Sequence, residues 1–113
     1  AYQTYELIEC MERDSKIKIT EIKVDGGMVK NNNFLQSIAN ITQIKIIRPK
    51  NIETTSLGVA YLAAIQSGLI KNTKQIEKFL KIDKITKTKI NKNEAISNIN
   101  IWKKIFRTVN KFY

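Results

Sequence analysis

Two runs rich in β-branched residues constrain the fold of this 113-residue chain more than any other feature. The first, IKITEIKV over residues 17–24, ends in the turn DGG, and the second, IKIIRP over residues 44–49, ends in a proline. Between them, residues 31–40 carry apolar side chains on one side of a helix. A strand, a helix and a strand in this order predict a parallel pair joined by a right-handed crossover.

Helical spacing of apolar residues predicts four further helices, near residues 4–14, 53–68, 73–80 and 93–110. The helix over 53–68 is apolar on several sides, which predicts that it is buried; Thr54 or Thr55 can cap its start and Gly68 can close its end. A short strand is expected at residues 86–90. Two strands make a poor free-standing sheet, so further strands are expected in sequence outside this chain.

Length and composition favour one α/β unit without an internal boundary. A chain of this size fits a single domain or one piece of a larger one. It begins at Ala1 rather than at a methionine, which suggests a fragment or a processed product. The sequence has no apolar window long enough to span a bilayer and no secretory leader, so we expect a cytoplasmic protein without a membrane partner.

A formal net charge of +10 is the most visible feature of the composition. Nucleic-acid binders usually concentrate Arg and Lys in a stripe, whereas lysine here is spread from Lys16 to Lys111. The one local enrichment is KIDKITKTKINK, residues 81–92. A solvated basic surface is therefore the favoured interpretation, and no specific nucleic-acid partner is expected.

Catalytic and metal-binding side chains are scarce. Cys10 is the single cysteine, so an internal disulfide is excluded and a buried or inert thiol is expected. The sequence has no histidine. It therefore supplies neither a histidine base nor a histidine-ligated metal site.

The DGG turn has two open interpretations. Ligands bind beyond the carboxyl ends of strands in α/β sheets, where Gly26 and Gly27 allow positive φ and close approach of the backbone. With the amide of Asn31, this arrangement suits an adenine or ribose edge. Strand-to-helix turns also use glycine for steric reasons alone, and Asn31 serves equally as a helix N-cap. The GxxxxGK[ST] and GxGxxG signatures are absent.

Three stretches together carry a family resemblance: AYQTYELIECMERDS at residues 1–15, VDGGMVKNN at 24–32 and RPKNIETTSLGVAYLAA at 48–64. In this order they resemble the C-terminal part of the FGGY family of carbohydrate kinases, and its glycerol kinase members in particular. The spacing matches without gaps from Val24 to Ala63. The resemblance extends more weakly to Trp102 and Lys103, so it covers essentially the whole chain.

The resemblance implies an α/β fold that forms part of an actin-like, ribonuclease-H-type ATPase domain, with residues 1–113 closing its second, nucleotide-side domain. It also implies ATP with Mg²⁺ as cofactor. Gly27 and Asn31 match positions that contact the adenosine part of the nucleotide, and Asp25 has a structural role in the turn. Glycerol would be bound by segments upstream of Ala1, which would also hold the catalytic base and the phosphate-binding loop. No catalytic or metal-binding residue is therefore assigned in this chain, and the complete enzyme is a candidate homo-oligomer.

Two hypotheses of different classes remain open. In the first, the chain is the C-terminal segment of an ATP-dependent glycerol kinase, which transfers the γ-phosphoryl group to a substrate hydroxyl. In the second, it is a non-catalytic remnant or a small basic binding protein without kinase activity. The coding sequence upstream of Ala1 distinguishes them, because an intact reading frame with the phosphate-loop and sugar-binding segments favours the first.

Overall fold

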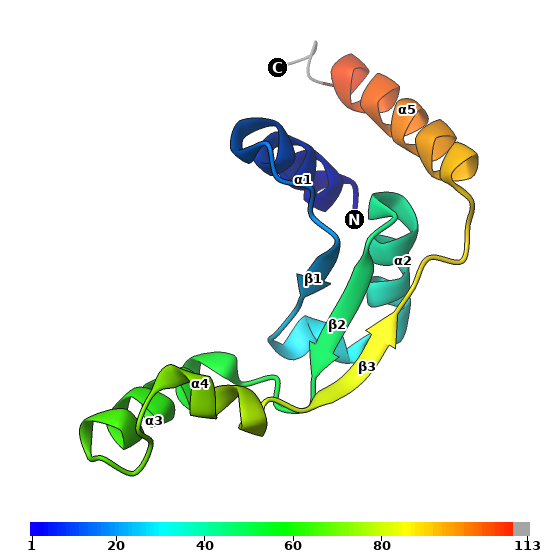
Figure 1. Cartoon of the computed structure of the whole chain (residues 1–113). Helices are drawn as coiled ribbons and strands as arrows, with labels where there is room; N and C mark the ends of the chain where they lie inside the picture. The colour runs from blue at the N-terminus through cyan, green and yellow to red at the C-terminus, as the bar shows by residue number, and fades with distance from the viewer. Residues whose placement is uncertain (110–113) are drawn as a thin grey trace.

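The two β-branched runs and the apolar helical spacings form most of the predicted elements in the computed structural model of the chain, which describes residues 1–109 (Figure 1). In chain order the elements are α1 (Tyr2–Ser15), β1 (Glu21–Lys23), the 3-10 turn η1 (Gly27–Lys30), α2 (Asn32–Thr42), β2 (Lys45–Pro49), α3 (Thr54–Gln66), α4 (Thr73–Ile76), the 3-10 turn η2 (Glu77–Phe79), β3 (Ile82–Thr86) and α5 (Lys92–Val109). The end of the last predicted helix, Asn110, lies outside the described residues.

The sheet has three strands in the order β1-β2-β3. Strands β1 and β2 are parallel, with Ile22 opposite Ile46, which confirms the predicted strand–helix–strand unit. Strand β3 runs antiparallel to β2, with Ile47 opposite Ile85, so the sheet is mixed. The fold class is α/β, as predicted.

The strand expected at residues 86–90 was placed too late in the sequence, because the structure puts β3 at Ile82–Thr86. The residues after β3 bond to side chains of α2 and do not pair with the sheet. Gln36 donates to the Lys87 carbonyl at 2.8 Å, and the Lys89 N–H donates to Asn40 at 2.8 Å. The lysine-rich connection is therefore bound to α2.

The first strand is shorter than predicted, since of residues 17–24 only Glu21–Lys23 belong to β1. The preceding residues are held by α1. The Glu12 carboxylate accepts hydrogen bonds from the Lys18 ammonium at 2.7 Å and from the Ile19 N–H at 2.8 Å. Ile17 consequently lies exposed in the link between α1 and β1.

The core lies between α2 and the sheet. Leu35 on α2 and Ile46 on β2 are fully buried, and the cluster around them consists of Val29, Ile38 and Ala39. Leu35, Ile38 and Ala39 share the apolar face that the sequence predicts for this helix. Burial of a large aliphatic side chain contributes about 1.5–3 kcal/mol, so this small cluster supplies much of the stability of the sheet region.

Helix α5 packs beside α1 through aromatic rings. The Trp102 ring stacks on Tyr2 at a centroid distance of 5.5 Å and on Phe106 at 5.3 Å. An ion pair at 3.2 Å joins Lys103 to Glu9. Trp102 is thus a packing anchor, as predicted.

Helices α3 and α4 form an arm, residues 54–80, that extends away from the sheet (Figure 1). The prediction that α3 is buried on several sides is wrong, because none of its residues is buried. The arm makes the chain elongated, with a radius of gyration of 17.8 Å and extents of 56 × 30 × 28 Å. A compact domain of this length has a radius of about 13 Å.

The ends of α3 differ in how well they were predicted. Gly68 has φ +79 and its N–H donates to the Ile65 carbonyl at 3.0 Å, so it closes the helix as expected. At the start, Glu53 is the N-cap and provides no side-chain capping bond. The Thr54 hydroxyl instead donates to the Asp25 carboxylate in the turn after β1.

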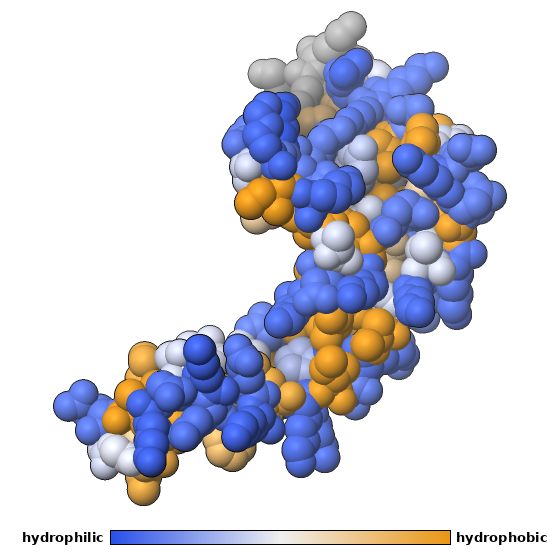
Figure 2. Space-filling model, viewed as in Figure 1, coloured by the Kyte–Doolittle hydropathy of each residue, from blue (hydrophilic) through white to orange (hydrophobic). Residues whose placement is uncertain are grey.

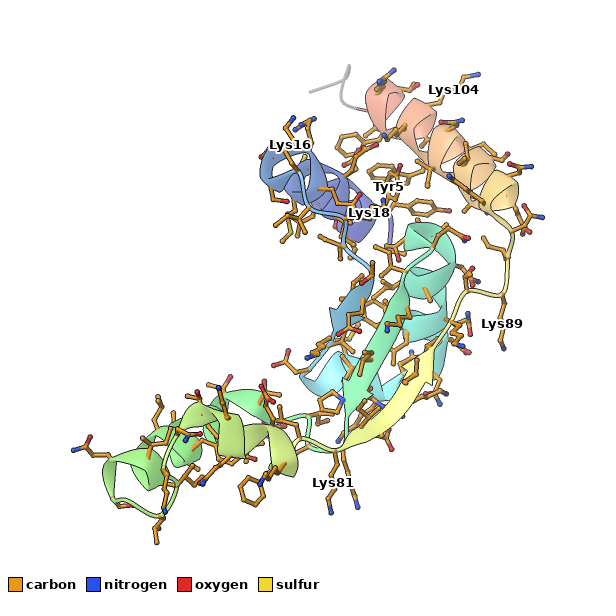
Figure 3. All side chains as sticks on the ribbon, viewed as in Figure 1. Tyr5, Lys16, Lys18, Lys81, Lys89 and Lys104 are labelled. Carbon is orange, nitrogen blue, oxygen red and sulfur yellow. The ribbon has the colours of Figure 1, made fainter. Side chains whose placement is uncertain are left out.

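Cationic side chains are dispersed over the molecule. The labelled lysines in Figure 3 lie just after α1, in the link to β1, just before β3, in the lysine-rich connection and on α5. Cys10 is exposed and accepts a hydrogen bond from Arg13, so of the two expectations for this thiol the buried one is wrong and the inert one stays a prediction. Within residues 1–109, no helix has the length and apolar character needed to cross a membrane.

The Glu12 contacts predict a pH dependence of the α1–β1 link. The Lys18 ammonium and the Ile19 N–H hold the pKa of Glu12 below its ordinary value of 4.5. A lowered folded-state pKa means that the stabilisation is complete above pH 4.5 and is lost as the pH falls through the folded-state value. The protection factor of the Ile19 amide, which compares its hydrogen-exchange rate with the intrinsic rate at the same pH, should therefore fall on acidification, and in Glu12→Gln it should be low already at neutral pH. Glu6→Gln, on the same helix, is the control and should change neither.

Candidate functional site

The turn after β1 lies at the carboxyl end of the parallel strand pair, where α/β sheets place ligands. The Val24 N–H donates to the Ile47 carbonyl at 3.1 Å, which extends the pairing one residue beyond β1. Asp25 and Gly26 follow, and η1 then carries the chain into α2. Gly27 and Asn31 therefore flank a single 3-10 turn.

Gly26 has the conformation that requires glycine. Its φ of +84° and ψ of 175° lie in a region that side-chain-bearing residues essentially never occupy. Its N–H donates to the Ile52 carbonyl at 3.0 Å, which fixes the turn against the segment before α3. A steric reason for glycine is thus present at this position.

Gly27 has no such steric reason. Both glycines of the turn allow positive φ, but among the glycines of residues 1–109 only Gly26 and Gly68 have it. A Cβ at Gly27 would meet no atom within 4 Å. The described residues thus leave the space beside Gly27 open to a group from outside this segment.

Asn31 caps helix α2. Its side-chain carbonyl oxygen accepts from the Asn33 N–H at 3.0 Å and from the Phe34 N–H at 3.2 Å. The capping interpretation is therefore confirmed. A contact with a nucleotide stays a prediction, and it would use the side-chain amide N–H groups because capping occupies the oxygen.

Asp25 joins the turn to the arm by accepting the hydrogen bond from Thr54. This is the structural role expected for Asp25. With the bond between Gly26 and Ile52, it makes two connections between the glycine turn and the start of α3. The position of the arm and the position of the turn are therefore linked.

Arg48 is a residue of this region that the sequence reasoning missed. Its Nε and Nη2 atoms lie 2.7 Å from Asp83 Oδ2 on β3. Its Nη1 atom donates to the Val29 carbonyl at 2.8 Å and to Asn32 Oδ1 at 3.2 Å. The side chain is only 14% exposed. The position of Arg48 before Pro49, at the end of a predicted strand, was the available sequence signal for a role in this region. Its hydrogen-bond partners lie too far away in the sequence to be inferred.

Two grooves lie near the turn, between the sheet and the arm. One, of about 740 Å³, has lysine, aromatic and aliphatic walls that include Lys30, Lys50, Lys81, Leu57 and Phe79. The other, of about 630 Å³, includes Val24, Asp25 and Thr54. Gly27 and Asn31 line neither groove. They form an open surface and not an enclosed pocket.

The described residues offer no metal centre. Within residues 1–109, no three side chains of His, Cys, Asp or Glu come close enough to hold an ion. The carboxylates nearest the turn are committed, since Asp25 is bonded to Thr54 and Asp83 is paired with Arg48. The site is thus built from backbone, one amide and structural polar contacts.

Comparison with known proteins gives a consistent result. A family model described as the FGGY family of carbohydrate kinases, C-terminal domain, matches residues 1–67. The glycerol kinase of Mycoplasmopsis pulmonis is 40% identical over 114 residues, which cover 92% of this chain and 22% of that protein.

Solved structures agree in fold. A Plasmodium falciparum glycerol kinase with ADP superposes with a TM-score of 0.84 at 27% identity, over 95% of this chain and 22% of that one. A xylulose kinase from Lactobacillus acidophilus gives a TM-score of 0.68 at 25% identity, over 86% of this chain and 21% of that one. The chain therefore spans about a fifth of the length of these proteins, and its fold is part of an actin-like ATPase fold.

Substitution of the two glycines should have different effects on stability. Gly26→Ala should lower the free energy of unfolding by about 1–3 kcal/mol, because alanine is strained at this φ and ψ. Gly27→Ala should be close to neutral, because φ is ordinary and the space is open. Urea titration followed by circular dichroism measures both. Equal losses in the two variants would contradict the conformational difference between them.

The contacts of Arg48 with η1, α2 and β3 should contribute to stability, and this contribution should depend on the charge and shape of its side chain. Arg48→Met should cost about 1.5–3 kcal/mol, the range for hydrogen bonds to charged groups. Arg48→Lys should recover part of the loss, because one ammonium can replace the ion pair with Asp83 but not the fork to Val29 and Asn32. A double-mutant cycle with Asp83→Asn isolates the ion pair. Additive losses would exclude coupling between the two residues.

Proposed function

Because the chain belongs to the FGGY family of carbohydrate kinases, we propose that it serves as the C-terminal part of an ATP-dependent glycerol kinase and forms one wall of the adenosine site. The reaction would transfer the γ-phosphoryl group of ATP to a glycerol hydroxyl and give glycerol 3-phosphate and ADP. Residues 1–113 would close the nucleotide-side domain without an internal boundary. The observation that carries the proposal is the open glycine turn at the carboxyl end of the parallel strands.

Gly27 and Asn31 are the residues proposed to contact adenosine. The free space beside Gly27 admits a flat ring or a ribose edge close to the backbone. The side-chain amide of Asn31 offers donors to acceptor atoms of that group, while its oxygen stays engaged in the cap. These groups bind and orient the nucleotide, and they take no part in bond making.

The chemical step would be carried out by groups outside residues 1–109. The glycerol oxygen would form a bond to the γ-phosphorus, the bond from that phosphorus to the β–γ bridging oxygen would break, and the hydroxyl proton would pass to a base. Mg²⁺ would accompany ATP and neutralise phosphate charge. No three His, Cys, Asp or Glu side chains of residues 1–109 come together to hold an ion, and none of these residues is assigned to Mg²⁺.

The remaining parts of the proposal concern the complete kinase. Glycerol would be held by segments outside this chain. The complete enzyme would be cytoplasmic and would assemble as a homo-oligomer. Positioning of ATP against glycerol supplies much of the rate in phosphoryl transfer, which is why one wall of the nucleotide site has no activity by itself.

A non-catalytic remnant or a small basic binding protein is the alternative. The observation on its side is the composition, 20 Lys and Arg against 10 Asp and Glu. The spread of the lysines over most of the chain counts against a specific basic binding surface. In this case the fold would persist without nucleotide binding. An interrupted reading frame upstream of Ala1 would support the alternative.

A chimera tests the proposed function. The segment of the Mycoplasmopsis pulmonis glycerol kinase that matches this chain is exchanged for residues 1–113, and ADP release is measured with ATP, Mg²⁺ and glycerol. The chimera should show glycerol-dependent turnover, whereas the chain alone should show none. An inactive but folded chimera would favour the remnant.

Variants of the chimera test the two contacts. Gly27→Val should raise KM for ATP, because its side chain fills the space left for the nucleotide. Asn31→Asp should raise it about two- to tenfold, the equivalent of one hydrogen bond, while preserving the cap. KM for glycerol should stay constant. Asn33→Asp, in the first turn of α2, is the matched control, and an unchanged KM for ATP in both site variants would remove them from the site.

A further inference from the structure

Helix α3 presents an uncharged surface on a highly charged chain. Residues 54–70 contain no Asp, Glu, Lys or Arg, whereas the chain as a whole is 27% charged. Solvent-facing helices normally carry charged residues on the exposed face. None of the α3 residues is buried, and Leu62 and Leu69 are 68% and 83% exposed.

Only one face of α3 has a partner within the arm. The Tyr61 ring stacks on Phe79 at a centroid distance of 6.3 Å, and Leu57, Ala64 and Ile65 on the same side are half-buried. The other face, which we call the free face of α3, consists of Val59, Leu62, Ala63 and Gln66, all exposed and at helical spacing. Figure 2 shows apolar side chains at the surface of the arm.

The arm keeps a defined position even though its free face is uncovered. The chain superposes over 95% of its length on a glycerol kinase chain of which it represents 22%, with a TM-score of 0.84. The same disposition thus occurs in a chain more than four times longer. An exposed apolar patch of this kind marks an interaction surface, and the additional part of the longer chain is available to cover it.

We propose that the free face of α3 docks on the part of an FGGY kinase that lies outside this segment, against an apolar and uncharged surface. The inference rests on the proposed function. It adds the surface through which this segment joins the kinase. The bonds of Gly26 to Ile52 and of Thr54 to Asp25 connect the docked arm to the glycine turn, so docking also holds the turn in place.

A second copy of the chain is the competing occupant. Each copy carries a formal net charge of +10, which opposes self-association. The remainder of a kinase, unlike a second copy, need not carry the same positive charge. The observations therefore favour the kinase over a homodimer.

Co-expression tests the docking surface. The tagged chain is produced together with the Mycoplasmopsis pulmonis glycerol kinase lacking its matching segment, and the captured complex is quantified. Leu62→Glu, on the free face, should reduce capture about tenfold or more, because docking would bury an unpaired carboxylate. Val59→Lys should act similarly. Leu7→Glu replaces an equally exposed apolar residue on α1 and should leave capture unchanged.

The outcomes separate docking from the adenosine site. Circular dichroism of each purified variant confirms that the chain is folded. Loss of capture only in the arm variants supports the proposal, and equal capture in all variants, or none with the unsubstituted chain, overturns it. A homodimer that Leu62→Glu dissociates, measured by ultracentrifugation, overturns it in favour of a second copy. If capture depends on the arm but Gly27→Val leaves KM for ATP unchanged in the chimera, docking stands and the adenosine site is rejected.

Discussion

The guanidinium group of Arg48 joins the parts of the molecule on which the glycine turn depends. From the end of β2 it bonds the carbonyl of η1, the start of α2 and the carboxylate of Asp83 on β3. A planar fork with several donors can satisfy these partners at once, which a lysine cannot do. The Arg48 side chain is 14% exposed and Asp83 is 45% exposed, so solvent screens the ion pair on the Asp83 side, whereas the bond to the Val29 carbonyl is partly buried. The turn is therefore held from β2 and β3, although it is covalently attached to β1.

The structure divides into a well-packed region and an incompletely covered one. Around Leu35 and Ile46 the helix and sheet bury aliphatic side chains fully, whereas the arm contributes no fully buried residue. Two hydrogen bonds between the glycine turn and the start of α3 span the two regions. A group that covers the arm would consequently also restrict the motion of the turn, since both are connected through the same short segment.

The chemistry available to the described residues is binding and positioning. The turn offers bare backbone at Gly27 and amide donors at Asn31, with no group of residues able to hold a metal ion within residues 1–109. Such a surface can recognise one side of a flat, polar ligand but cannot enclose it. The chain covers about a fifth of the length of the related kinases. A complete nucleotide site would therefore need further walls from the other parts of such a kinase.

The sequence by itself determined the local elements, because they depend on short-range patterns. The β-branched runs, the apolar spacing of α2 and the capping side chain of Asn31 predicted the parallel unit, and the motifs around DGG predicted the family. Only the tertiary structure decided which glycine is strained, where β3 lies and what Arg48 contacts, because each depends on partners distant in the chain. It also decided the exposure of α3: an all-round apolar pattern shows that a helix needs covering, but whether covering is present depends on which other segments reach it. The same limit explains Gly27, whose open surroundings follow from the path of the whole turn and not from its neighbours in sequence.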